Sequence, residues 1–189
     1  LHGPAWRNKA LLYAHAQRNE EALAGIEHAL ALDPTVADAW VIKGVLLGRL
    51  GRHAEAIAAY DRALELNPRD ASAWFNKANS PGVTNRVEAL RCLDQALASD
   101  PTHVSAWSFK GTLLGEIGRP EAGVPCLQEA VRLDPGDATL HYNLGNGWTA
   151  LGRLEDAAAC YEASIRIDAE APIAWYNLAL TRFRLGQHK

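Results

Sequence analysis

Asparagines recur along this chain at separations close to multiples of 34 residues: Asn8, Asn76, Asn143 and Asn177. A side-chain amide both donates and accepts hydrogen bonds, so it can pair with both polar groups of one peptide unit. A row of such amides could hold the backbone of an extended peptide without reading its side chains. Ile42 and Phe109 interrupt the row, and the alternative is that these asparagines are exposed and have no binding role.

Aromatic and further polar residues stand beside these asparagines. Phe75, Tyr142 and Tyr176 each precede one of them, and Asn146 follows three residues after Asn143. Apolar and aromatic side chains on a helix face that core packing does not need mark an interaction surface. The predicted binding groove therefore consists of Asn8, Asn76, Asn143, Asn177, Asn146, Phe75, Phe109, Tyr142 and Tyr176.

The three cysteines, Cys92, Cys126 and Cys160, also stand 34 residues apart. A metal or redox site is one interpretation of this spacing. We favour small buried side chains where helices crowd, because Gly25 and Ala59 hold the same position in earlier copies. Stacked helices lie ~8–10 Å apart, beyond the ~7 Å Cα separation that a disulfide bridges. We therefore predict reduced thiols, no metal site and a cytoplasmic protein.

The sequence carries none of the short motifs that accompany catalysis or cofactor binding. It has no phosphate-binding loop, zinc-protease, serine-hydrolase or paired-cysteine motif, so we predict no catalytic residues, no cofactor and no enzymatic activity. A formal net charge of −3 argues against nucleic acid as a partner. No apolar run approaches the ~18 residues needed to cross a membrane, which predicts no membrane insertion.

The elements that must position these residues follow from the same period. Pro34, Pro68, Pro101 and Pro135, each preceded by Asp or Asn, close successive copies of one motif. A tryptophan stands six residues after the first three prolines, and His141 stands six residues after the fourth. A fixed period of this size is the signature of a solenoid.

Residues 37–70 are the most regular copy. With Ala37 as position 1, the copy carries Trp40 at position 4, Gly44 at 8, Leu47 at 11, Ala56 at 20, Tyr60 at 24, Ala63 at 27 and Pro68 at 32. These residue types at this spacing resemble the tetratricopeptide repeat family. The resemblance implies an all-α, right-handed α-solenoid of antiparallel helix pairs, with about eleven helices. It also implies a concave groove, lined by the first helix of each pair, that receives a peptide.

We expect one solenoid over residues 1–189, with repeats at 3–36, 37–70, 71–103, 104–137 and 138–171 and half a repeat at 172–189. On a helix of 3.6 residues per turn, positions 4, 7, 8 and 11 of each first helix form one stripe. We expect this stripe, including the tryptophans, to be the core. The small residue at position 8 lets the paired helix approach.

Some copies depart from this pattern. Pro81 should end the first helix of repeat 71–103 near Asn79, with a loop through Thr84 and a helix cap at Asn85. Asn19 could cap the second helix of the first repeat. In repeat 104–137, Pro125 predicts a second helix that starts late or is distorted. Ala169, in place of the closing proline, predicts a less sharply specified turn.

These features predict a protein–protein interaction scaffold that binds an extended or helical peptide in its groove. Positions 2 and 6 carry no Lys or Arg, so capture of a C-terminal carboxylate is not expected. One alternative is head-to-tail self-association through the terminal repeats, in which exposed Trp175, Leu178 and Leu185 would take part. Another is the targeting arm of a larger enzyme whose catalytic domain lies outside this chain.

Overall fold

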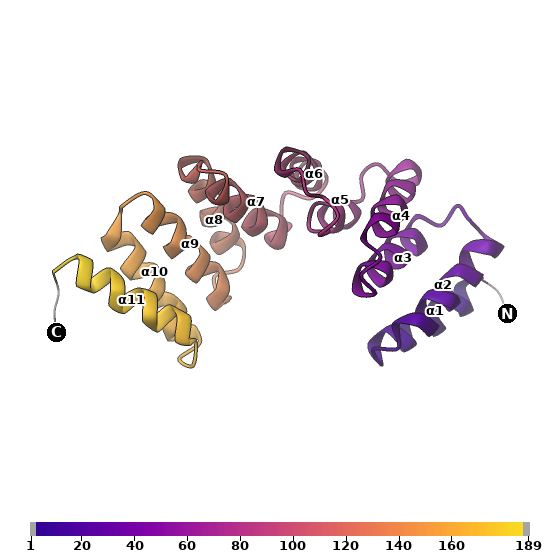
Figure 1. Cartoon of the computed structure of the whole chain (residues 1–189), viewed down its shortest axis with the longest axis horizontal. Coiled ribbons are helices and arrows are strands. Elements are labelled where there is room, and N and C mark those ends of the chain that lie inside the picture. Colours follow the sequence, from indigo (N-terminus) through magenta and orange to yellow (C-terminus); the bar gives the residue numbers. More distant parts are fainter. Residues whose placement is uncertain (1–2, 187–189) are drawn as a thin grey trace. The chain divides into compact units, whose positions relative to one another are not determined.

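The computed structural model describes residues 3–186 and contains eleven α-helices and no strand in that range (Figure 1). The helices are α1 (Gly3–His15), α2 (Asn19–Leu32), α3 (Ala37–Arg49), α4 (His53–Leu66), α5 (Ala71–Ala78), α6 (Arg86–Ser99), α7 (Val104–Glu116), α8 (Pro120–Leu133), α9 (Ala138–Ala150), α10 (Leu154–Ile167) and α11 (Pro172–Arg184). The predicted all-α class and number of helices are confirmed.

The chain divides into two compact units, Leu1–Pro101 with α1–α6 and Thr102–Lys189 with α7–α11. Within each unit an odd-numbered helix packs against the even-numbered helix that follows it, and that helix packs against the next odd-numbered one. Short turns join the two helices of a pair, which therefore run antiparallel. A single solenoid over residues 1–189 stays a prediction.

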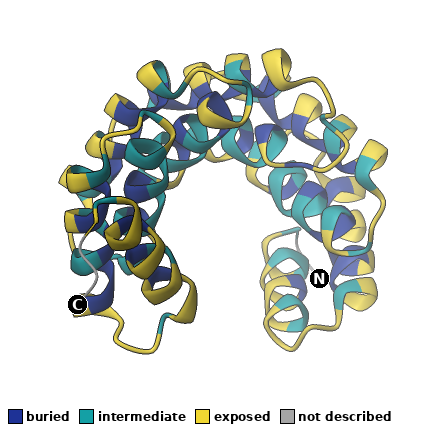
Figure 2. Cartoon of the chain, turned by 60° about the vertical axis from the view of Figure 1, so that its left-hand side comes forward, coloured by how far each residue is buried: buried dark blue, intermediate teal, exposed yellow. Residues whose placement is uncertain are grey.

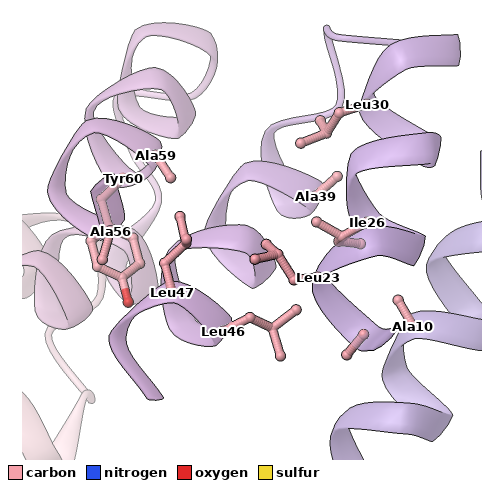
Figure 3. Close-up of a cluster of buried hydrophobic side chains, with 11 residues drawn as sticks. Ala10, Leu23, Ile26, Leu30, Ala39, Leu46, Leu47, Ala56, Ala59 and Tyr60 are labelled. Atoms are coloured by element: carbon pink, nitrogen blue, oxygen red, sulfur yellow. The ribbon is translucent and has the colours of Figure 1, made fainter. Parts of the chain in front are cut away.

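Each pair is held together by apolar side chains on the faces that meet. In the first unit, Leu23 and Ile26 of α2 and Leu46 and Leu47 of α3 are buried together with Tyr60 of α4 (Figure 3). Buried residues lie where helices of a unit meet, whereas the turns are mostly exposed (Figure 2). Burying a side chain of this size contributes about 1.5–3 kcal/mol.

The tryptophans at position 4 have a role that their helical face did not predict. Trp40 and Trp74 are only half-buried, and each indole Nε1–H donates to the carbonyl of the proline six residues earlier, Pro34 or Pro68, at 2.9 Å. His141 Nε2 lies 3.0 Å from the corresponding carbonyl of Pro135. The prediction that position 4 belongs to the core is confirmed in part, because Trp40 and Trp74 pack against the buried core while the edge of each ring bonds to the turn between two repeats.

Position 7 belongs to the core in α9 and α11, where Leu144 and Leu178 are buried, but not in the helices that carry lysine there. Lys43 occupies it in α3, over the ring of Trp40, and its Nζ lies 3.0 Å from Glu27 on α2. Lys77 occupies the same position in α5, with its Nζ 2.6 Å from Asp61 on α4. These lysines link a first helix to the second helix before it, because a long side chain can lie along the ring while its charge reaches an acid.

The irregular third repeat folds as its sequence predicts. Helix α5 ends at Ala78, and Asn79 is its C-cap. The side chain of Asn85 accepts hydrogen bonds from the backbone N–H groups of Val87 and Glu88 at 2.9 and 3.4 Å and so caps α6. Two of the four unpaired N–H groups at the start of α6 are thereby satisfied.

Three local predictions were wrong. Asn19 is the first residue of α2 and does not cap it, because Arg18 holds the cap position. The late start expected for α8 was wrong, since the helix begins at Pro120, and Pro125 lies on its exposed face, where water can bind the carbonyl that loses its partner. The turn at Ala169 matches the others, since Trp175 donates to the Ala169 carbonyl at 3.0 Å.

Candidate peptide-binding groove

In the first unit, the predicted groove residues lie on α1 and α5. Asn8 is exposed on α1, and Phe75 and Asn76 are half-buried on α5. The interrupting residue Ile42 lies on α3 between them, in a pocket of about 240 Å³ with Val41 and other residues of α1 and α3. The first unit therefore presents an apolar hollow rather than a continuous row of amides.

In the second unit, the predicted residues lie on three successive first helices. Phe109 lies on α7, Tyr142, Asn143 and Asn146 lie on α9, and Tyr176 and Asn177 lie on α11. All are half-buried except Tyr176, which is 67% exposed. The first helices of successive repeats stand side by side. Residues at the same repeat position therefore lie on the same face of each of these helices.

The amides of the second unit bond to neighbouring first helices. Asn143 Nδ2 donates to Ser108 Oγ on α7 at 3.3 Å. Asn177 Nδ2 on α11 donates to Asn146 Oδ1 on α9 at 3.2 Å and to the Tyr142 hydroxyl at 3.4 Å. These bonds join residues 31 to 35 positions apart in the chain, so the row is part of what aligns the helices.

Tyr161 of α10 supports the row from beneath. Its hydroxyl donates to Asn146 Oδ1 at 2.8 Å and lies 3.0 Å from Thr149 Oγ1. Burial raises the pKa of the Tyr161 phenol, so the hydroxyl stays a donor at neutral pH. Because the Oδ1 of Asn146 receives both this bond and that of Asn177, the side chain is held in one orientation.

Three atoms of this hydrogen-bond network remain available to a ligand. In the described residues, the Oδ1 atoms of Asn143 and Asn177 and the Nδ2 of Asn146 have no intramolecular partner. The face thus keeps two acceptors and one donor, which are the groups that a peptide backbone pairs with. Sequence reasoning missed Ser108, Thr149 and Tyr161. The pairing of Tyr161 with Gly145, like that of Tyr60 with Gly44, was the available signal.

The cysteines lie away from this face and are all free. Cys92 and Cys126 are buried and Cys160 is partly buried. Burial raises the pKa of the Cys160 thiol to about 11, and burial also raises that of Cys92. In residues 3–186 no group of three His, Cys, Asp or Glu side chains is placed to hold a metal ion, and no helix is long and apolar enough to cross a membrane.

A larger hollow of about 490 Å³ lies on α5 and α6 of the first unit, beside Trp74, Lys77 and Arg91. Its walls carry several charged side chains and none of the predicted groove residues. This hollow is therefore separate from the predicted groove face.

Comparisons with known proteins agree with the repeat pattern. Sequence profiles of the tetratricopeptide repeat match residues 37–70, 110–172 and 149–189, which together cover more than half of the chain. A search of curated protein sequences finds no match.

Solved structures share the fold. PilF of Pseudomonas aeruginosa superposes with a TM-score of 0.87 at 16% identity, over 98% of this chain and 85% of that protein. MamA of Desulfovibrio magneticus RS-1 gives 0.78 at 22% identity, over 89% and 96%. YrrB, described as a tetratricopeptide repeat protein with an unusual peptide-binding site, gives 0.75 at 25% identity, over 87% and 85%. The five helix pairs and the single helix α11 of residues 3–186 agree with the repeat profiles, which show that the chain belongs to the tetratricopeptide repeat family.

Proposed function

We propose that this protein is an interaction scaffold that binds an extended peptide segment on the face of its first helices. The observation that carries the proposal is the row of Asn143, Asn146 and Asn177 across α9 and α11, flanked by Tyr142 and Tyr176. These side chains are only partly used in packing, since Tyr176 is 67% exposed and Asn143, Asn146 and Asn177 are half-buried. The family supports a role as a protein-interaction scaffold in general, and the peptide-binding site of YrrB supports a peptide as the ligand.

The row is preorganised for this task. Bonds to Ser108, Tyr142 and Tyr161 already hold the amides, so little side-chain entropy is lost when a peptide binds. The open amide atoms would pair with peptide N–H and C=O groups and tolerate many sequences. Tyr176 would supply apolar contact. In the first unit, the apolar pocket that contains Val41 and Ile42 would accept an apolar side chain of an extended peptide or of a helical segment.

The test replaces Tyr142 and Asn143 together by alanine. Peptides selected by phage display on the wild-type protein serve as probes, and their dissociation constants are measured by fluorescence anisotropy. We expect binding to weaken at least about tenfold, because aromatic residues at the centre of an interface carry much of its energy. The control replaces Gln128 and Arg166, exposed on α8 and α10, and should bind as the wild type does. An unchanged affinity of the Tyr142/Asn143 variant, with its fold intact by circular dichroism, contradicts the assignment.

A second candidate function is self-association, favoured by one face of α11. The small residue at position 8 is buried in α1, α3, α5, α7 and α9, whereas Ala179 at this position of α11 is exposed. Trp175 on the same helix is 50% exposed. A second copy of the chain, which exposes Leu12 and Leu32 on α1 and α2, would cover this face. Leu178, which was expected to take part, is 3% exposed and packs inside the unit instead.

Three further predictions stay predictions. They are that the chain has no catalytic activity of its own, that it acts in the cytoplasm, and, as the alternative to the scaffold function, that it serves as the targeting arm of a larger enzyme.

A further inference from the structure

A pocket of about 280 Å³ lies in the second unit, between the N-terminal ends of α9 and α11 and the C-terminal end of α10. Tyr142 and Thr139 of α9, Ser164 and Asp168 at the end of α10, and Pro172 and Ile173 of α11 contribute to its walls. Tyr142 belongs to the proposed groove, so the pocket opens beside the path of a bound peptide. Its walls are mainly apolar, with Ser164 and Asp168 as polar exceptions.

Ser164 is the first unusual feature of this pocket. The other four second helices carry alanine at the same position: Ala29, Ala63, Ala96 and Ala130. Ser164 is 2% exposed, yet its hydroxyl has no hydrogen-bond partner in the described part of the chain. The other second helices fold with a methyl group here, so the fold does not need the hydroxyl, and its oxygen is available to a ligand group in the pocket.

Asp168 is the second polar residue of this pocket, and like Asp33 and Asp134 at the same position of other repeats it carries an exposed carboxylate. Its Oδ1 accepts a hydrogen bond from the Glu170 N–H at 3.0 Å, as the same turn requires in other repeats. Among the described residues no cation pairs with its carboxylate, whereas Asp156 and Glu162 of the same helix pair with Arg153 and Arg182. The pocket therefore keeps an uncompensated negative charge at its rim.

The first unit contains the corresponding pocket, of about 370 Å³, and there the cation is built in. Arg7 lines it at the position that Tyr142 holds in the second unit, and Asp33 lines it at the position of Asp168. Ala29 stands where Ser164 stands. The pocket of the second unit thus has Tyr142 in place of an arginine and the Ser164 hydroxyl in place of a methyl group.

We propose that the pocket of the second unit binds a lysine side chain of the peptide held in the groove; this inference rests on the proposed function. The four methylenes of lysine lie along Tyr142 and Ile173, and the ammonium group donates to the Ser164 hydroxyl and the Asp168 carboxylate. A lysine stem covers apolar surface while its charge stays at a polar rim. The face of the Tyr142 ring adds a cation–π contact.

The test uses three peptides that differ at one residue, each an acetylated and amidated pentapeptide of alanine with lysine, norleucine or glutamate at the centre. Norleucine keeps the aliphatic stem without the amine. Each peptide is titrated into the ¹⁵N-labelled full chain, and backbone amide shifts are followed by NMR. We expect the lysine peptide to shift the amides of Ser164, Asp168 and Ile173, with an affinity at least about threefold above that of the norleucine peptide.

Two variants and a matched control complete the test. Asp168→Asn keeps the oxygen that accepts from Glu170 and removes the charge, and should remove the lysine preference. Ser164→Ala, which restores the residue of the other repeats, should weaken the lysine peptide about two- to fivefold. Asp134→Asn is the control, because Asp134 ends α8 as Asp168 ends α10 and accepts from Gly136 N–H at 3.2 Å. It should leave the lysine preference unchanged.

Equal binding of the lysine and norleucine peptides on the groove face overturns the lysine pocket and leaves the proposed function standing. A lysine preference that survives Asp168→Asn also overturns it. If a pooled library of peptides shifts no amide along α7, α9 and α11, both proposals fail.

Discussion

Tyr161 links the packing of the second unit to its candidate site. Its ring lies where a side chain at Gly145 would be, and its hydroxyl holds Asn146 and Thr149. A Cβ added at Gly145 would lie 2.6 Å from a ring carbon of Tyr161. The ring has little freedom to move aside, because its hydroxyl is tied at two points.

We predict that Gly145→Ala and Gly115→Ala change stability in opposite directions. Gly145→Ala should lower the free energy of unfolding by about 1–3 kcal/mol through overpacking against Tyr161. Gly115 lies in α7 with no atom within 4 Å of the Cβ that alanine would add. Its replacement should raise stability by about 0.5–1 kcal/mol, because glycine in a helix loses more backbone entropy on folding. Urea unfolding measures both, and a destabilised Gly115→Ala or a neutral Gly145→Ala would refute the packing.

The Cys160 thiol should react slowly with iodoacetamide in the native protein. Burial raises its pKa from 9.0 to about 11, and the thiolate is the reactive form. At pH 8 the thiolate fraction is then about a hundredfold lower than for an ordinary cysteine. Mass spectrometry of alkylated peptides against pH should show half-maximal reactivity near pH 11.

The raised pKa of Cys160 also determines how the stability of the protein changes with pH. The unfolded chain loses the Cys160 proton at lower pH than the native protein does, so stability is full below pH 9 and falls as pH rises toward 11. Tyr60, whose pKa burial raises to about 12, adds to this loss above pH 10. Half-maximal alkylation of Cys160 near pH 9 in the native protein would contradict its burial.

At the scale of elements, the ends of the helices decide how the repeats connect. In three inter-helix turns a glycine, Gly51, Gly118 or Gly152, has φ between 72° and 77°, and in the first repeat Gln17 adopts φ 57° in its place. In the third repeat a longer loop after α5 replaces this turn, and Asn85 at the end of the loop caps α6.

The cap of α6 can be tested by comparing Asn85, which caps α6, with Asn19, which lies at the start of α2 without capping it. Asn85→Ala should destabilise the protein by about 1 kcal/mol, because two backbone N–H groups of α6 lose their acceptor. Asn19→Ala in α2 should be neutral or stabilising, since Asn19 is not the cap and its buried Oδ1 has no partner among the described residues. Thermal unfolding compares the two. Equal losses would mean that the Asn85 cap has no special role.

At the scale of the whole molecule, the exposed face of α11 is where we expect a second copy of the chain to bind, if copies associate. Each earlier first helix presents position 8 to a partner helix of its own unit, and α11 leaves Ala179 exposed. A closed pair or an open chain of copies would both bury this face.

We predict that Ala179→Glu abolishes self-association at high protein concentration. A charge at the centre of the open face would have to be buried without a partner when a second copy binds. Ala150→Glu is the matched control, since Ala150 is exposed on α9. Sedimentation velocity over a dilution series should show a concentration-dependent larger species for the wild type and the control. A wild-type chain that stays monomeric throughout would rule out this candidate function.

The sequence by itself determined the period, the number of helices and the break in the third repeat. These features depend on local rules: a proline inside a helix removes a hydrogen bond, and an asparagine before a helix caps it. The sequence also identified which residues share the face of the predicted groove, because positions on one helix face follow from 3.6 residues per turn.

Only the tertiary structure decided what each face touches. The helical wheel placed Trp40 in the core, and its ring does pack there, but only the structure shows that its indole N–H bonds to the turn before the helix. The hydrogen bond from Asn177 to Asn146 joins residues that are 31 positions apart in the chain. This bond and the pocket that Ser164 lines both depend on how neighbouring helices stack. A periodic sequence specifies which way a side chain points along its own helix, whereas the neighbour that it meets is set by the packing between helices.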